Sequence, residues 1–255
     1  MISLKTTEEI KLMREGGKIL GNILKELADA VAPGITTASL DKLARELILF
    51  YKVKPSFLGY GGFQAVLCTS VNDEVVHGVP SNRVLKEGDI VGLDFGVIHG
   101  GLHTDSAITM PVLGSKNRKE WAKENPKVAK LVEVAKSALT IGIKQARAGR
   151  RLGEISQAIQ EYVEGEGFGI VRDLVGHGIG EKLHEEPYVP NYGDKNDGPL
   201  LQEGMTIAIE PMVTMGDWQV KQVGQVFKTR DGSLSSHFEH TILITQRSAE
   251  VLTSF

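Results

Sequence analysis

Cysteine, basic clusters and long apolar runs are scarce or missing in this chain of 255 residues. Its single cysteine, Cys68, rules out an intramolecular disulfide framework and fits a reducing compartment. No uncharged apolar run approaches the roughly 20 residues that a membrane-spanning helix needs. Residues 1–18 are charged and amphipathic, without the apolar core of a signal peptide. These absences predict a cytoplasmic protein that does not enter a membrane.

The formal net charge of -3 at pH 7 is close to neutral. No basic stripe with interleaved aromatic residues is present to predict nucleic-acid binding, and residues 116–119 are expected to form a solvated loop. With 41% hydrophobic and 24% charged residues, the chain has the composition of a globular protein with a sizeable core. Its length allows one large domain or two small ones.

Apolar residues at helical spacing predict two helices in the first part of the chain. The first follows a capping-box pattern at Thr6 and Glu9 and stops at Pro33-Gly34. The second starts near Thr37 and ends before Lys54-Pro55, because a residue that precedes proline avoids helical dihedral angles.

A glycine-rich bend at 59–63 then leads into an expected strand near 66–71. Further along, Asn125-Pro126 predicts the start of a third helix, with asparagine as the cap and proline in the first turn. This helix is expected to break at Gly149, and a fourth, shorter helix follows.

The order long helix, glycine break, shorter helix and extended segment thus occurs twice. Gly34 and Gly149 each lie six residues before an apolar position of the shorter helix. A period of about 115 residues is too long for a solenoid and is a weak sign of duplication; coincidence between common helix stops is the alternative. We expect a single domain, residues 1–255, with pseudo-symmetric halves at about 1–115 and 116–255 and a shared site at their interface.

The stretch 88–110 carries a clear strand pattern. Apolar residues alternate from 91 to 97, and Asp94 points to the other face. A His-Gly-Gly turn and a second strand-like segment follow, which together predict a β-hairpin. If His99 and the next glycine form the loop, Asp94 faces Asp105 directly across the two strands.

Directly opposed side chains in such a pair lie roughly 4.5 to 5.5 Å apart at Cβ, and like charges there are destabilising. A divalent metal ion between the two aspartates would remove the repulsion, since hard cations prefer carboxylate oxygens. The alternatives are a solvated hairpin with two surface acids and a register shifted by one residue.

The second half of the chain adds further candidate ligands. A glycine-rich bend surrounds His177. Predicted strands at 205–213 and 238–245 carry Glu210 and Glu239 among apolar residues, and such acids are rarely buried unless paired or metal-bound.

Each of these residues alone has an ordinary explanation, as a satisfied loop histidine or as a charge that keeps an edge strand soluble. Together the chain offers four carboxylates and one imidazole, from Asp94, Asp105, Glu210, Glu239 and His177. Such a set suits a dinuclear site rather than a structural zinc site built on cysteines. Two ions roughly 3.5 to 4 Å apart would hold a bridging water and lower its pKa.

These residues stand in eight motifs, which in chain order are Leu58-Gly59-Tyr60, Cys68-Thr69-Ser70-Val71-Asn72, His77-Gly78-Val79-Pro80, the hairpin from Asp94 to Asp105, Gly176-His177-Gly178-Ile179-Gly180, His184-Glu185-Glu186-Pro187, Ile209-Glu210-Pro211-Met212 and Phe238-Glu239-His240-Thr241. With this strongly specific set, the chain resembles the type I methionine aminopeptidases of the pita-bread fold nearly from end to end. The resemblance implies an α+β fold in which two pseudo-symmetric βα halves and an antiparallel sheet hold a central dinuclear metal site.

The resemblance also implies roles for single residues. The implied metal ligands are Asp94, Asp105, His177, Glu210 and Glu239. Among these, Asp105 and Glu239 would bridge the two ions, and Glu210 would take a proton from the bridging water and pass it to the leaving amine.

His77 is similar in position to the family's histidine near the scissile amide nitrogen, and His184 to the one that contacts the substrate carbonyl oxygen. Both would stabilise the tetrahedral intermediate. Tyr60, Phe63 and Cys68 match positions in the wall of the methionine pocket, where aromatic groups suit a thioether. Ordinary core packing is the alternative for these three residues.

The chain departs from the family pattern at several positions. Phe57 stands where a cysteine is frequent, and Gly96 where a small hydroxyl residue is common. Gln225 occupies a place often held by tryptophan, and Trp218 lies seven residues earlier. These departures put the shape of the methionine pocket in question and leave the metal site unaffected.

Two other interpretations compete with this one. An Xaa-Pro aminopeptidase or prolidase would share all five ligands, but such enzymes usually carry an additional N-terminal domain, for which a first helix at about Thr7 leaves no room. A binding module of the same fold that has lost its ligands is the alternative from another class, and the intact set of five argues against it. The cysteine-rich extension and the long insertion of type II enzymes are also missing from the sequence.

The resemblance therefore implies a cytoplasmic metallo-aminopeptidase that removes the initiator methionine from new polypeptides and prefers a small second residue. Its cofactors would be two divalent ions, with Mn²⁺, Fe²⁺, Co²⁺ and Zn²⁺ all compatible with the ligands. The expected partners are nascent N-termini and, transiently, the ribosome, and the expected state is a monomer.

Overall fold

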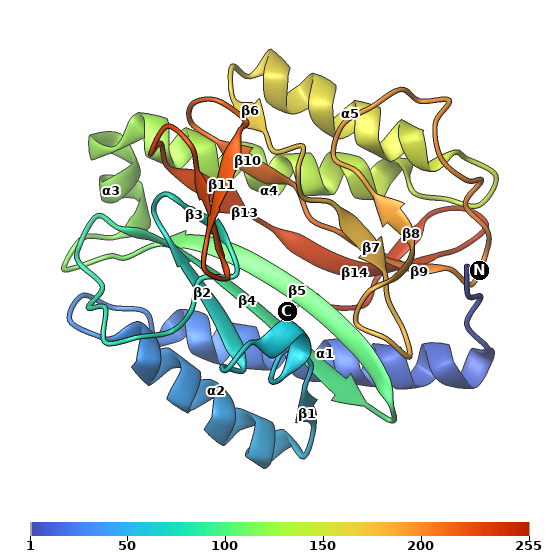
Figure 1. Cartoon of the computed structure of the whole chain (residues 1–255), viewed down its shortest axis with the longest axis horizontal. Helices are drawn as coiled ribbons and strands as arrows, with labels where there is room; N and C mark the ends of the chain where they lie inside the picture. The colour runs from blue at the N-terminus through green and yellow to red at the C-terminus, as the bar shows by residue number, and fades with distance from the viewer. Residues whose placement is uncertain (1, 255) are drawn as a thin grey trace.

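The computed structural model describes residues 2–254, and within them one large curved sheet carries most of the strands (Figure 1). Its antiparallel order is β1-β4-β5-β14-β9-β7-β8, and β2 and β15 pair with β4 and β14. The bounds of these strands are β1 Lys54–Pro55, β2 Leu67–Val71, β4 Ile90–His99, β5 Leu102–Pro111, β7 Gly176–Gly178, β8 Glu185–Val189, β9 Thr206–Ile209, β14 Glu239–Ile244 and β15 Ala249–Val251.

Two smaller antiparallel sheets border the large one. One has the order β13-β10-β6 and the other β11-β12-β3. Their strands are β3 Glu74–Val76, β6 Gly169–Ile170, β10 Met212–Thr214, β11 Val220–Val223, β12 Val226–Thr229 and β13 Ser235–His237.

Helices cover the sheet at two places (Figure 1). The helix α1 (Thr7–Asp29) packs on β4 and β5, and α2 (Thr37–Tyr51) lies beside it. The helix α4 (Pro126–Gln145) packs on β10, β13 and β14, with α5 (Leu152–Gly165) against it. No helix within residues 2–254 is long and apolar enough to cross a membrane.

The hydrophobic core follows this division. One buried cluster lies where α1 and α2 meet the sheet and contains the alternating apolar residues of β4, such as Leu93 and Phe95. A second lies between α4, α5 and the sheet, with Leu131 and Ile155 fully buried. The predicted apolar row of β4 is therefore confirmed, and it leaves the other face of the strand free for polar side chains.

The helix predictions are largely confirmed. The Thr6 side chain accepts a hydrogen bond from the Glu9 backbone, and the Glu9 carboxylate accepts one from the backbone of Thr6. The helix α1 ends at Asp29, however, before the predicted stop at Pro33-Gly34. Pro126 begins α4 as predicted, but the Asn125 side chain donates to the carbonyl oxygen of Trp121 instead of capping α4.

The prediction of a solvated loop at 116–119 is wrong in its second half. A short helix, α3 (Arg118–Glu124), begins there. Asn117 caps it by accepting hydrogen bonds from the backbone of Lys119 and Glu120, and the Glu120 carboxylate accepts one in return from the backbone of Asn117. Residues 117–120 thus form a capping box that begins with asparagine instead of serine or threonine.

The predicted hairpin register is also wrong. The two loop residues are Gly100 and Gly101, and His99 pairs with Leu102, the first residue of β5. Asp94 therefore lies opposite Ala107, and Asp105 lies opposite Gly96. Both glycines have positive φ, at 58° and 86°, which a two-residue hairpin of this twist requires and which glycine adopts without strain. The two aspartates therefore share one face of the hairpin as diagonal neighbours.

The predicted strand at 205–213 is interrupted at Glu210. The chain leaves the large sheet after Ile209 and enters the β13-β10-β6 sheet at Met212, since Pro211 has no backbone N–H to donate to a ladder. The predicted strand at 238–245 is confirmed as β14, which begins at Glu239, with one residue between it and the end of the short β13. Both glutamates thus stand at points where the chain passes between sheets.

Candidate metal centre and substrate pocket

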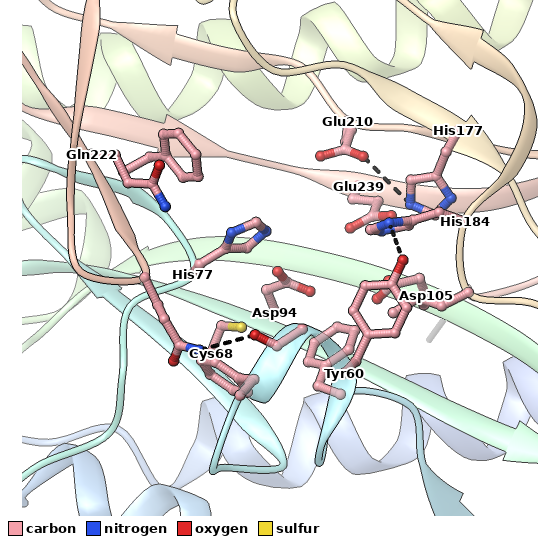
Figure 2. Close-up of a pocket in the computed structure, with 16 residues that line it drawn as sticks. Tyr60, Cys68, His77, Asp94, Asp105, His177, His184, Glu210, Gln222 and Glu239 are labelled. Carbon is pink, nitrogen blue, oxygen red and sulfur yellow. Dashed lines mark hydrogen bonds and ion pairs between the residues drawn. The ribbon is translucent and has the colours of Figure 1, made fainter.

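A pocket of about 240 Å³ lies over the middle of the large sheet. Every site residue predicted from the sequence lines it (Figure 2). The full lining consists of Phe57, Tyr60, Gly61, Phe63, Cys68, His77, Asp94, Asp105, His177, Leu183, His184, Glu210, Gln222, Gln225, Phe227 and Glu239. The fold therefore brings together residues that lie far apart in the sequence.

The five predicted metal ligands come from neighbouring strands. Asp94 and Asp105 project from β4 and β5, Glu239 from β14, His177 from β7, and Glu210 follows β9. Figure 2 shows their carboxylates and imidazole gathered around one space.

The ligand atoms are close enough to share ions. Donor atoms of Asp105, His177 and Glu239 lie within 4.8 Å of one another. Nε2 of His177 is 3.6 Å from Oε1 of Glu210. Four of the five side chains are buried, and the Glu210 side chain is 13% exposed.

Burial makes the charges of these carboxylates costly. It is the largest cause that raises the pKa of Asp105 and of Glu210 to about 8, and it raises the pKa of Asp94 and of Glu239 well above the usual range. Neighbouring carboxylates add to the shift at three of the four, Glu210 excepted. Within residues 2–254, Oδ1 of Asp94 and Oε1 of Glu239 are buried without a hydrogen-bond partner. Four crowded carboxylates with unpartnered oxygens and an adjacent imidazole fit divalent metal ions, which supply the missing positive charge.

Two further histidines face this cluster. His184 precedes β8, and His77 follows β3 with a positive φ of 58°. Burial lowers the pKa of each to about 4, so both imidazoles are neutral at pH 7. Nδ1 of His184 lies 2.9 Å from the Tyr60 hydroxyl, and its ring centroid is 4.2 Å from that of His177.

The remaining wall is apolar and aromatic. Phe63 and Cys68 are buried, whereas Tyr60 is 48% exposed at the mouth. Phe57 lines the same wall, and Leu183 also contributes. An unbranched thioether side chain suits such a surface.

The β11–β12 hairpin borders the mouth of the pocket. Gln222 and Gln225 line it, and Nε2 of Gln225 is 3.5 Å from the carbonyl oxygen of Gly61 on the opposite rim. Trp218 is outside the described lining and has its ring 5.1 Å from the Arg172 guanidinium. Gln225 therefore contributes a polar amide to the pocket rim, where the family often has a tryptophan. Trp218 does not line the pocket in place of that tryptophan.

One histidine at the site, His237, was not predicted from the sequence. It is buried, and its Nε2 lies 3.5 Å from Oε2 of Glu210 and 4.0 Å from Oε2 of Glu239. Its position two residues before Glu239 could have predicted this placement, because alternate residues of an extended segment point to the same face.

The fold and this site define a class, the metal-dependent peptidases. The model of metallopeptidase family M24 matches residues 11–246, so the chain belongs to that family.

Relatives at higher identity narrow the assignment. A methionine aminopeptidase of Clostridium acetobutylicum is 47% identical over 99% of both chains. The crystal structure of methionine aminopeptidase from Thermotoga maritima is 45% identical, with full coverage of both chains and a TM-score of 0.92. Within family M24, the chain belongs with the methionine aminopeptidases, and the predicted α+β pita-bread fold is confirmed.

More distant structures share only the fold. A prolidase from Pyrococcus furiosus is 23% identical with a TM-score of 0.74, and the match covers 99% of this chain but 65% of the prolidase. At this identity the likeness carries no information about substrate.

Proposed function

We propose that this site hydrolyses the peptide bond after an N-terminal methionine with two divalent metal ions, bound by Asp94, Asp105, His177, Glu210 and Glu239. One observation carries the proposal: three buried carboxylates, a fourth that is 13% exposed, and an imidazole converge in a pocket whose other wall is aromatic and apolar. Removal of methionine is also the activity that the names of the relatives state. The proposed substrates are the N-termini of newly made polypeptides.

The ions would contribute Lewis acidity, because a water held between two divalent ions loses a proton near neutral pH. Asp105 and Glu239 would hold the ions together with Asp94, Glu210 and His177, and the five residues stand on or just after strands that follow one another in the sheet order β4-β5-β14-β9-β7. The donor set suits Mn²⁺, Fe²⁺, Co²⁺ or Zn²⁺.

The chain itself moves the protons and orients the substrate. Glu210 would accept the proton that the attacking water loses and donate it to the leaving amine. His184, neutral at pH 7, would donate a hydrogen bond to the substrate carbonyl oxygen, and His77 would contact the scissile amide nitrogen. We expect a small second residue in the substrate, because that residue has to lie between these histidines and the carboxylates.

Metal removal and replacement tests the proposal. The protein is stripped with a chelator, Mn²⁺ or Co²⁺ is added back stepwise, and cleavage of Met-Ala-Ser is followed beside that of Ala-Pro-Ser. Metal-dependent release of methionine from the first peptide alone supports the proposal. Cleavage of only the second peptide, or of neither despite bound metal, contradicts it.

A variant separates catalysis from folding. Glu210→Gln keeps the shape of the side chain and removes the general base, so turnover should fall about 10²- to 10⁴-fold while the circular dichroism spectrum is unchanged. Near wild-type turnover would remove Glu210 from the mechanism.

A further inference from the structure

His237 places a buried imidazole against two of the proposed metal ligands. The residue is 4% exposed, and its Nε2 has no hydrogen-bond partner among the described residues. The nearest acceptors are Oε2 of Glu210 at 3.5 Å and Oε2 of Glu239 at 4.0 Å. A buried polar nitrogen without a partner costs folding free energy, and the two carboxylates are the groups with which this nitrogen can pair.

The backbone around His237 fixes the position of the ring. His237 ends β13 and is paired with Met212 of β10. Its N–H donates to the Thr109 hydroxyl at 2.9 Å, and its carbonyl oxygen accepts from the same hydroxyl at 2.8 Å. The imidazole is therefore presented to the carboxylates by a rigid strand.

The two oxygens of Glu210 face different imidazoles. Oε1 lies 3.6 Å from Nε2 of His177, and Oε2 lies 3.5 Å from Nε2 of His237. A neutral imidazole carries one N–H, and a proton on Nε2 of His237 is the favourable arrangement once metal binding has ionised the neighbouring carboxylates. A hydrogen bond of about 2.9 Å would need a shift of only about 0.6 Å.

We propose that His237 is a positioning residue that donates from Nε2 to Oε2 of Glu210 and so keeps Oε1 turned toward His177. This inference rests on the proposed function, in which Glu210 is both a ligand and the general base. Ligating carboxylates are commonly oriented by such outer partners, whose loss weakens metal binding about 10- to 100-fold. The competing arrangement is direct ligation, because Glu210, His237 and Glu239 also have donor atoms within 4.8 Å of one another.

Three variants distinguish the two arrangements. His237→Leu removes the donor at similar bulk. His237→Gln keeps an N–H, because its amide nitrogen is as many bonds from Cβ as Nε2 of histidine, but an amide is a poor ligand for these metals. His237→Asn carries the same amide on a side chain that is one bond shorter, so the amide does not reach Glu210. If His237→Leu does not fold, His237→Asn replaces it in the comparison.

Calorimetric titration of the metal-free proteins with Mn²⁺ gives a readout that is independent of turnover. We expect His237→Leu to weaken Mn²⁺ binding about 10- to 100-fold and His237→Gln to restore it to within a few-fold of wild type. On Met-Ala-Ser, His237→Leu should lower kcat about tenfold or more with little change in KM. His103→Leu, in which the lost imidazole is bonded only to Ser56 among the described side chains, should leave Mn²⁺ affinity unchanged.

Two results would overturn the inference. Wild-type Mn²⁺ affinity and kcat in His237→Leu would mean that the imidazole does not act on Glu210. Equal losses in His237→Gln and His237→Leu would assign His237 as a metal ligand instead. If the Mn²⁺ pattern holds but no protein releases methionine, the proposed function fails and the positioning role stands.

Discussion

The Tyr60 hydroxyl oxygen lies 2.9 Å from Nδ1 of His184, and the two rings meet edge to face with centroids 5.0 Å apart. Figure 2 shows this contact beside the carboxylate cluster. A hydroxyl that donates to Nδ1 leaves the proton of the neutral imidazole on Nε2. With the hydroxyl as the donor, Tyr60 would contribute more than pocket wall, since it would select the tautomer with which His184 can donate to a carbonyl oxygen.

Replacing Tyr60 with phenylalanine tests this role. The ring stays in the pocket wall, so KM for Met-Ala-Ser should change little, whereas kcat should fall about tenfold for the loss of one hydrogen bond of roughly 1.5 kcal/mol. Steady-state kinetics on the metal-loaded protein measures both constants. Tyr51→Phe, which removes a hydroxyl bonded to Glu26 on the surface, is the matched control and should be silent. A raised KM with unchanged kcat would mean that Tyr60 only lines the pocket and does not act on His184.

Local patterns in the sequence predicted most of the fold. The capping box at Thr6 and the alternating apolar row of β4 both depend on near neighbours in the chain, and both are confirmed. The hairpin register required knowing which residues occupy the turn, and positive φ at both Gly100 and Gly101 decided it. A shift of the loop by one residue moves the partner of Asp94 by two positions.

The predicted site residues all line one pocket, and what the sequence could not give was their surroundings. His237 is one position from Phe238 and two from Glu239, yet its nearest carboxylate oxygen belongs to Glu210, which lies on another segment. The break of the strand at Glu210 likewise depends on a change of sheet at Pro211. Such contacts between distant segments follow from the assembled sheets, which no local pattern contains.

The metal-free protein should lose stability as the pH rises from about 6.5 to about 8. The folded-state pKa of Asp105 and of Glu210 is about 8, against about 4 in an unfolded chain, so their contribution is complete below pH 4 and is lost as the pH rises through 8. The histidines of the site have lowered pKa values. Their contribution to the stability of the fold is complete above about pH 6.5 and changes only below that pH. Between about pH 6.5 and 8, only the ionisation of the carboxyl groups of the site changes the stability.

Thermal unfolding of chelator-treated protein across this pH range measures the effect, and we expect the Tm to fall by several degrees. Saturating Mn²⁺ should cancel the fall, because ionised carboxylates bind the metal and protonated ones do not. Asp105→Asn, which lacks one of the two carboxyl groups, should show a shallower fall. A Tm that rises with pH in the metal-free protein would contradict the assignment of these groups as protonated.

Gly78 holds the segment of His77 against β2. A Cβ at this position would lie 2.2 Å from the carbonyl oxygen of Thr69, so even alanine requires the backbone to move. We expect Gly78→Ala to lower the free energy of unfolding by about 1 to 3 kcal/mol and to reduce kcat by displacing His77. Denaturant unfolding and steady-state kinetics check the two effects. Gly92→Ala is the control, because its Cβ would meet no atom closer than 3.6 Å, and equal losses in both variants would contradict the steric argument.

Lys5 anchors the start of the chain to the loop that carries His184. Its side chain is 2% exposed, and its Nζ lies 2.9 Å from Oε2 of Glu185, whose Oε1 accepts a hydrogen bond from the backbone of Lys182. Removing one partner of a buried ion pair leaves the other charge without compensation and costs about 3 to 5 kcal/mol. We therefore expect Lys5→Met to lower the free energy of unfolding by that amount and to reduce kcat by loosening His184.

The exposed pair of Lys42 and Glu46, 4.0 Å apart with the lysine side chain 80% exposed, provides the comparison. Lys42→Met should cost no more than about 1 kcal/mol, because water screens such a pair. The double variant Lys5→Met/Glu185→Gln should recover part of the loss, since it removes the stranded carboxylate together with its partner. Urea unfolding of the variants measures the free energies. A Lys5→Met variant as stable as Lys42→Met would mean that the buried pair does not hold the loop in place.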